Sequence, residues 1–177
     1  EGKYLSRKQQ MDLAGKITAF SKDPRLAMQT EHLTWLVKTQ KVSGDRPVQV
    51  QRYQAGQVTA QVTTNSFDSA LDRKIINLQG NVQLNAVKPL IQVNGESFNW
   101  NFDRDLVTAD RPLTIFHQKE AVTFNANGGE LDLQASTATL TGNAQGIATR
   151  NQAKLSADKL VWQMTSQQIV GTGNVIY

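Results

Sequence analysis

The feature that most constrains the fold of this sequence is an internal repeat of about sixty residues. Three tryptophans, Trp35, Trp100 and Trp162, are spaced by 65 and 62 residues. A glycine stands twenty residues before each of them, at Gly15, Gly80 and Gly142. Four residues before each tryptophan is an acid, and two before it is an apolar residue: Glu31, Glu96, Asp158, and Leu33, Phe98, Leu160. This shared register predicts a repeat architecture in which each copy is one supersecondary unit.

The repeat unit has the pattern of β-structure. Polar and apolar residues alternate around the tryptophans, as in residues 97–102 (SFNWNF), and strict alternation is the period of a half-buried strand. Turn signals such as Asn94-Gly95 separate the alternating runs. No segment after Gln10 carries a sustained helical stripe of apolar residues. The chain is therefore expected to be all-β, and this pattern alone leaves a sandwich, a jelly roll and a β-solenoid open.

The predicted organisation is a single domain preceded by a short segment. Residues 1–12 are polar and charged, and we expect a lead-in that is either a short helix or disordered. Residues 13–177 are expected to form one domain of three tandem units, about 13–65, 66–127 and 128–177. A chain of 177 residues is long enough for one well-buried core and short for two.

One face of the predicted strands is apolar and is the candidate lipid-binding surface. The plain alternative is that these side chains only fill a core, but a roll that does not close fully would leave an apolar trough. Its candidate residues are Trp35, Val37, Val93, Phe98, Trp100, Phe102, Leu113, Ile115, Leu155, Leu160, Trp162 and Met164. At about 0.8 kcal/mol per buried CH₂, a twelve-carbon chain would gain roughly 9 kcal/mol before the costs of binding.

The C-terminal run is the candidate partner edge. Asn174, Val175, Ile176 and Tyr177 are strand-like and carry neither charge nor proline. An unprotected edge strand exposes unpaired N–H and C=O groups, which another chain can pair with by β-augmentation. The alternative is that this tail folds back on its own sheet.

The sequence offers little catalytic chemistry. It has no cysteine, no H-E-x-x-H motif and no phosphate-binding or dinucleotide fingerprint. His32 is expected on the wet face, and Glu31, Glu96 and Asp158 are expected to be structural rather than catalytic. Nineteen basic and fifteen acidic residues give a net charge of +4 without a basic run, which excludes a nucleic-acid patch. We therefore expect no enzyme activity, no metal and no cofactor.

The repeat resembles that of the OstA-like lipopolysaccharide-transport proteins. Residues 156–162 (SADKLVW), followed by residues 171–175 (GTGNV), carry this resemblance, and Gly80-Asn81-Val82 repeats its second element. The resemblance covers roughly residues 11–177. Asp-Arg-Pro stands in place of Gly-Asn-Val at residues 45–47 and 110–112, which is a departure from the family pattern.

This resemblance implies a repetitive antiparallel β-jelly roll of two facing sheets, partly open along one side. It implies a periplasmic bridge that shields the acyl chains of lipopolysaccharide or a related lipid and has no cofactor. The implied partners are other jelly-roll transport proteins, docked by β-augmentation, and an ABC transporter complex at the inner membrane. An LptC-like component is favoured, anchored to the inner membrane by a segment preceding residue 1, and an LptA-like bridge is the alternative within the family.

Two other classes of function remain as hypotheses at this point. A β-helical carbohydrate-active enzyme would need turnover that depends on a carboxylate such as Glu96. A structural β-repeat module would bind partners or copies of itself without any lipid.

Overall fold

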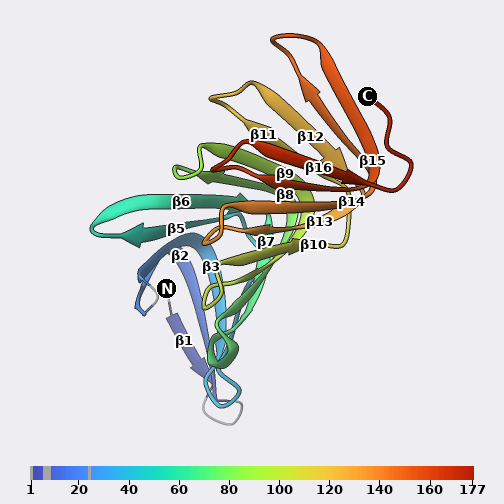
Figure 1. Ribbon diagram of the computed structural model, residues 1–177. Coiled ribbons are helices and arrows are strands. Elements are labelled where there is room, and N and C mark those ends of the chain that lie inside the picture. The colour runs from blue at the N-terminus through green and yellow to red at the C-terminus, as the bar shows by residue number, and fades with distance from the viewer. Residues whose placement is uncertain (1, 6–8, 24) are drawn as a thin grey trace.

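The computed structural model describes residues 2–5, 9–23 and 25–177, which fold almost entirely as antiparallel strands (Figure 1). The elements are β1 (Gly2–Leu5), β2 (Gln10–Lys22), β3 (Arg25–Leu36), β4 (Lys41–Gly44), β5 (Val48–Gln54), β6 (Gln57–Thr64), β7 (Ser66–Ala70), the 3₁₀ turn η2 (Leu71–Arg73), β8 (Ile75–Ala86), β9 (Ile91–Asn101), β10 (Leu106–Ala109), β11 (Leu113–His117), β12 (Val122–Ala126), β13 (Gly128–Asp132), β14 (Thr137–Ala148), β15 (Ala153–Gln163) and β16 (Gln168–Thr172).

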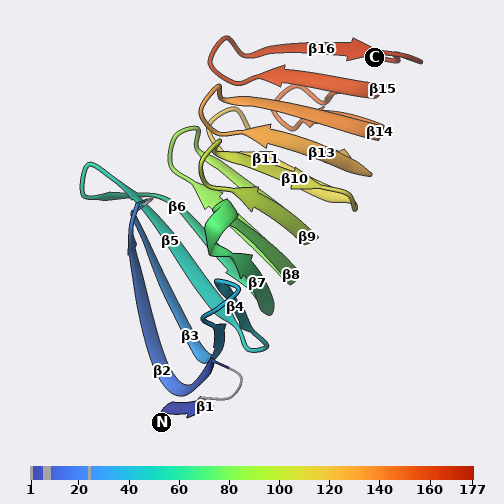
Figure 2. The ribbon, with the colours of Figure 1, turned by 90° about the horizontal axis from the view of Figure 1, so that it is seen from below.

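Long strands are shared between two facing sheets. The first part of β8 pairs with β7 and its last part with β6. In the same way, β9 pairs with β11 through its first part and with β10 through its last part. Figure 2 shows β7 to β10 and β13 to β16 following one another along the stack. The layer that contains β5 and β6 continues, by strand pairing, through β8, β9, β11, β12 and β14. This arrangement confirms the expected all-β, jelly-roll-like fold.

The repeated glycines make the corners between the two sheets. The pairing register of β8 shifts between Gln79 and Val82, and that of β14 shifts between Thr141 and Ala144. At the first shift Gly80 has φ +79° and Asn81 has φ +50°. This left-handed region suits glycine and, to a lesser degree, asparagine. A bulge there bends the strand, so that one strand continues into the second sheet.

The repeat is also visible in the backbone. The residue that follows each tryptophan strand donates a hydrogen bond to the carbonyl of a left-handed residue about 28 positions earlier. These bonds are Val37 N to Gln9 O at 3.0 Å, Phe102 N to Lys74 O at 2.9 Å, and Met164 N to Ser136 O at 3.0 Å. Gln9, Lys74 and Ser136 are spaced by 65 and 62 residues, as the tryptophans are. Each unit therefore closes with the same turn.

The second and third tryptophans lie in a closed core. Trp100 is fully buried and its ring centroid is 4.7 Å from that of Phe102. The ring centroid of Trp162 is 4.7 Å from that of Phe124, and the same ring packs edge-on against His117 with 5.0 Å between the centroids. Burial of each such apolar side chain is worth about 1.5–3 kcal/mol. The middle and C-terminal parts of the roll thus have a dry interior.

The N-terminal segment differs from the expectation of a short helix or a disordered lead-in. Residues Gly2–Leu5 form β1, which pairs antiparallel with residues 10–13 at the start of β2. The segment is polar because β1 lies at the margin of the sheet, where only Leu5 is partly buried. Its remaining residues, 1 and 6–8, lie outside the described residues. No helix in the described part of the chain is long and apolar enough to cross a membrane.

Candidate functional site

A cavity of about 530 Å³ lies between the two sheets at the N-terminal end of the roll. Its volume is in the range of small-molecule sites. Apolar side chains from both sheets form most of its wall: Met11, Leu13, Ile17 and Ala19 of β2, Leu26, Met28, Leu33 and Trp35 of β3, Val42, Val50, Phe67 and Ile76 of the facing strands, and Leu71 and Phe102 nearby. Such a wall suits a flexible apolar chain.

The alternation of β3 explains how this wall forms. Leu26 and Met28, which are two residues apart, both line the cavity, and so do Leu33 and Trp35. Ala19 of β2 pairs with Met28 of β3, so the two neighbours line it together. Side chains two apart on a strand share a face, and directly paired residues share the same face of the sheet. The sequence pattern therefore sends one face of this hairpin into the cavity.

The tryptophan of this unit lacks the aromatic neighbour that packs on Trp100 in the second unit. Phe102 stands two residues after Trp100, is 8% exposed and packs on that ring. The corresponding residue after Trp35 is Val37, which is smaller and 38% exposed. Trp35 is only partly buried and lines the cavity, and its buried Nε1 has no hydrogen-bond partner.

Ion pairs connect the two sheets at the rim of the cavity. Lys74 Nζ lies 2.9 Å from Asp103 Oδ1 and 3.7 Å from Asp23 Oδ2, on the turn between β2 and β3. The hydrogen bond and the charge of Asp103 raise the pKa of Lys74, with a further contribution from Asp23. Lys74 and Asp23 both line the cavity. The β2–β3 hairpin is thus linked to the facing sheet by charge.

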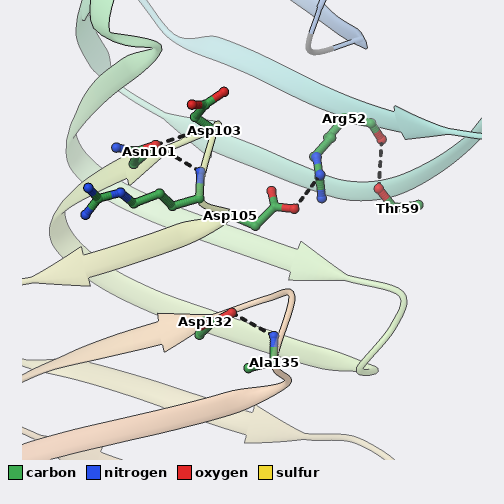
Figure 3. Close-up of polar contacts among 8 residues, drawn as sticks. Arg52, Thr59, Asn101, Asp103, Asp105, Asp132 and Ala135 are labelled. Carbon is green, nitrogen blue, oxygen red and sulfur yellow. Dashed lines mark hydrogen bonds and ion pairs between the residues drawn. The ribbon is translucent and has the colours of Figure 1, made fainter.

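A second ion pair between the sheets is more buried than the first. Arg52 Nη2 of β5 is 2.5 Å from Asp105 Oδ2, and both side chains are mostly buried. Figure 3 shows this pair joining the turn after β9 to the opposite sheet, with the Thr59 hydroxyl donating to the backbone carbonyl of Arg52 and with Asp132 at the end of β13. Burial raises the pKa of Asp105, while the charge and hydrogen bond of Arg52 oppose that rise.

The structure separates the predicted lipid-binding residues into three groups. Two of them, Trp35 and Phe102, line the cavity. Leu155 is partly buried against the core, and Val37 is exposed in the turn that follows β3. The others belong to the closed core: Val93, Phe98, Trp100, Leu113, Ile115, Leu160, Trp162 and Met164.

The residues of β2 were missed as part of the cavity. Met11 and Leu13 have the expected alternation, but the register of β2 shifts between Ala14 and Ile17. Counting alternate residues back from Trp35 identifies the inward face of β3, but the shift in register changes which residues of β2 face inward. The glycine that opens each unit, Gly15 here with φ +105°, was the available signal.

The polar candidates lie apart from the cavity. His32 is partly exposed and its Nδ1 is 2.7 Å from Asp45 Oδ1. Glu31, Glu96 and Asp158 are all exposed, and Asp158 accepts a hydrogen bond from Asn174 Nδ2 at 3.0 Å. Among the described residues no group of three or more metal-ligating side chains is present.

The C-terminal edge is partly covered by the tail. Ile176 and Ser156 of β15 exchange backbone hydrogen bonds of 2.8 and 2.9 Å, while Tyr177 is almost fully exposed. In the other sheet, β16 pairs with β15 and with no second strand of the described chain. One side of β16 therefore remains open as a sheet edge.

Fold and site together define a repetitive β-jelly roll whose interior is closed at one end and opens into an apolar cavity at the other. Residues 1–83, which include most of the cavity wall, match the family model described as lipopolysaccharide-assembly, LptC-related. This match supports the LptC-like assignment within the OstA-like family that the repeat suggested. The comparison with curated proteins found no match.

Members of the LptC family are components of lipopolysaccharide transport. It is a family of periplasmic, inner-membrane-associated transport proteins and is not known for enzyme activity.

Proposed function

We propose that this protein shields the acyl chains of lipopolysaccharide in its N-terminal cavity and passes them to jelly rolls docked at its sheet edges. The observation that carries the proposal is the cavity of about 530 Å³ with its apolar wall. It lies in the part of the chain that matches the LptC-related model.

The energetics suit a carrier. Burying a twelve-carbon chain gains roughly 9 kcal/mol. Association costs about 4–15 kcal/mol in lost translational and rotational freedom, and ordering the chain costs more. The surplus is small, so a bound chain can be released again.

Docking is proposed to use the open sheet edges. β16 has an unpaired side, and Val170 on it is 52% exposed. The adjoining residues Asn174, Val175, Ile176 and Tyr177 extend the same end of the roll. A strand of a partner jelly roll would pair there by β-augmentation. The proposed partners are other jelly-roll transport proteins and an ABC transporter complex at the inner membrane, and the proposed location is the periplasm.

The chain is proposed to act as one domain, residues 13–177, of three units. The first unit supplies most of the cavity wall, and residues of the second unit, among them Phe67, Ile76 and Phe102, complete it. The second and third units supply the closed core, and the eight candidate residues that belong to it would contact lipid only if the sheets separate.

Site-specific photo-crosslinking in the presence of lipopolysaccharide tests the proposal. A photoreactive side chain at Met28 or Phe102 is expected to give a lipid adduct because both residues line the cavity. Their neighbours Gln29 and Asn101 lie outside it and serve as matched controls. If a folded protein gave no adduct from Met28 or Phe102, or equal adducts from the controls, the carrier function would be wrong and a lipid-free interaction module would be the better reading.

A further inference from the structure

A second cavity, of about 700 Å³, lies on the outer face of the sheet that contains β8, β9, β11, β12 and β14. Its floor is a row of directly paired residues, one from each of these strands: Gln83, Asn94, Thr114, Asn125 and Gln145. Directly paired residues share one face of a sheet. The adjacent residues Leu84, Val93 and Ile115 are buried in the core, so the row faces away from the interior.

The lining of this outer cavity is polar and almost uncharged. Beyond the floor it includes Asn81, Asn127 and Asn143, near the corner between the two sheets. Among the described residues that line it, Glu96 is the single charged one, although the chain has nineteen basic and fifteen acidic residues. The row also stays neutral beyond the cavity, where the next paired residues are Thr63, Gln49 and Ser156.

Most of the amide groups in this cavity are free to bind a ligand. Asn125 accepts a hydrogen bond from Thr114 Oγ1 at 2.8 Å. The side chains of Asn81, Gln83 and Asn143 are exposed and make no hydrogen bond with another described residue. A primary amide offers two donors and one acceptor oxygen. The floor therefore presents donors and acceptors at intervals of one strand.

The chemistry of the lining favours a peptide as the ligand. An extended peptide carries one N–H and one C=O per residue, which match the donors and acceptors of the amide side chains. In the polyproline II conformation these groups form no internal hydrogen bonds and stay available to a partner. None of the described residues that line the cavity is aromatic, so no ring is present on which a sugar could stack.

The spacing of the floor also fits this conformation. A polyproline II helix advances about 9.3 Å in each three-residue turn. Neighbouring strands are about 4.7–4.9 Å apart, so two strand intervals span about 9.4–9.8 Å. A segment lying across the strands would therefore present the same face to every second strand. The four intervals from Gln83 to Gln145, about 19 Å, would accommodate about six residues.

We infer that the outer cavity binds an uncharged, extended segment of a partner protein, in polyproline II conformation and across the strands. The side chains of Gln83, Asn125 and Gln145 bond to the backbone of that segment. This surface is separate from the apolar cavity and from the open edge of β16, and it does not depend on the proposed carrier function.

Fluorescence anisotropy with labelled peptides tests the inference. The probe is a peptide of alternating alanine and proline, which favours polyproline II and keeps the N–H donors of its alanines. The control peptide has N-methylalanine in place of alanine and so lacks these donors. We expect the probe to bind about tenfold more tightly than the control, with little dependence on salt because the contacts are uncharged. Equal affinities, or a steep loss of affinity with salt, would overturn the inference.

The variant Gln83→Ala should raise the Kd of the probe about fivefold, which corresponds to one neutral hydrogen bond. The matched control is Asn85→Ala, because Asn85 is exposed on the same face of β8 and does not line the cavity. An unchanged Kd in Gln83→Ala, or an equal rise in Asn85→Ala, would contradict the proposed contact.

NMR spectroscopy of the wild-type protein locates the probe without any substitution. The side-chain amide signals of Asn125 and Gln145 should shift when the probe is added. Binding without these shifts would place the peptide elsewhere and overturn the inference. A chito-oligosaccharide that shifted the same signals at lower concentration than the probe would make the cavity a glycan site, and the inference would again be wrong.

Discussion

Filling the apolar cavity should weaken lipid binding and stabilise the fold at the same time. Ala19 lies on β2, pairs with Met28 and lines the cavity. The substitution Ala19→Leu adds three carbons, which at about 0.8 kcal/mol each contribute roughly 2.4 kcal/mol of burial. Ordering the leucine side chain costs about 0.5–1 kcal/mol. The free energy of unfolding should therefore rise by about 1.5 kcal/mol.

The same three carbons take the place of about three methylenes of a bound acyl chain. Losing them costs roughly 2.4 kcal/mol of binding free energy, which is about a fiftyfold rise in the Kd for decyl maltoside. Calorimetry gives the Kd, and urea unfolding gives the stability. The control is Ala153→Leu, the same change at an exposed position of β15 remote from the cavity.

The opposite signs of the two effects make the test strict. A variant that simply damages the fold would lose stability and binding together. Unchanged lipid affinity in a stabilised Ala19→Leu protein would refute the argument, because the cavity would then be filled without displacing any ligand. An equal loss of affinity in Ala153→Leu would refute it as well.

Three further predictions concern the core, the pH response and the edge. Leu160→Ala should cost about 2–5 kcal/mol in urea unfolding because Leu160 is fully buried, yet the lipid adduct at Met28 should persist; loss of that adduct in the folded variant would contradict a closed core that is separate from the cavity. Burial lowers the pKa of His117, so the unfolded chain, with its ordinary value of 6.5, binds the proton more readily. The free energy of unfolding should therefore fall as pH drops below 6.5, by at most about 1.4 kcal/mol per pH unit. The variant His117→Phe should remove this contribution to the pH dependence of stability, and an unchanged pH dependence would show that His117 is not responsible. Val170→Lys on β16 should reduce capture of a soluble LptA-like jelly roll at least tenfold with little change in thermal stability, since charge on an edge strand opposes pairing, and undiminished capture would move the docking site to another edge.

Much of the fold could be predicted from the sequence because the repeat and the alternation are local patterns. The register of Trp35, Trp100 and Trp162 indicated repeated β units, and parity from Trp100 placed Phe98 and Phe102 inside, where both are buried. The family match over residues 1–83 agrees with the resemblance carried by the short repeat motif.

The location of the cavity could not be predicted in the same way. Alternation identifies the face on which Trp35 and Trp100 lie, but it does not show whether the facing sheet covers that face. That outcome depends on which side chains reach across from the other sheet: Trp100 and Phe102 pack with their ring centroids 4.7 Å apart, whereas Val37, two residues after Trp35, is 38% exposed. Strand β1 was missed for a related reason, because four residues at a sheet margin bury too little to impose a pattern.

The sharing of long strands between both sheets has a mechanical consequence. Because β2, β3, β8 and β9 run through the corner, their covalent backbone prevents the sheets from sliding past each other or separating in parallel. The motion left to them is rotation about the line of bulges, near Gly15 and Gly80. The volume between the two sheets then depends on the angle between them. A partner that pairs with the edge of one sheet at one end of the roll would change this angle, and with it the volume of the cavity at the other end.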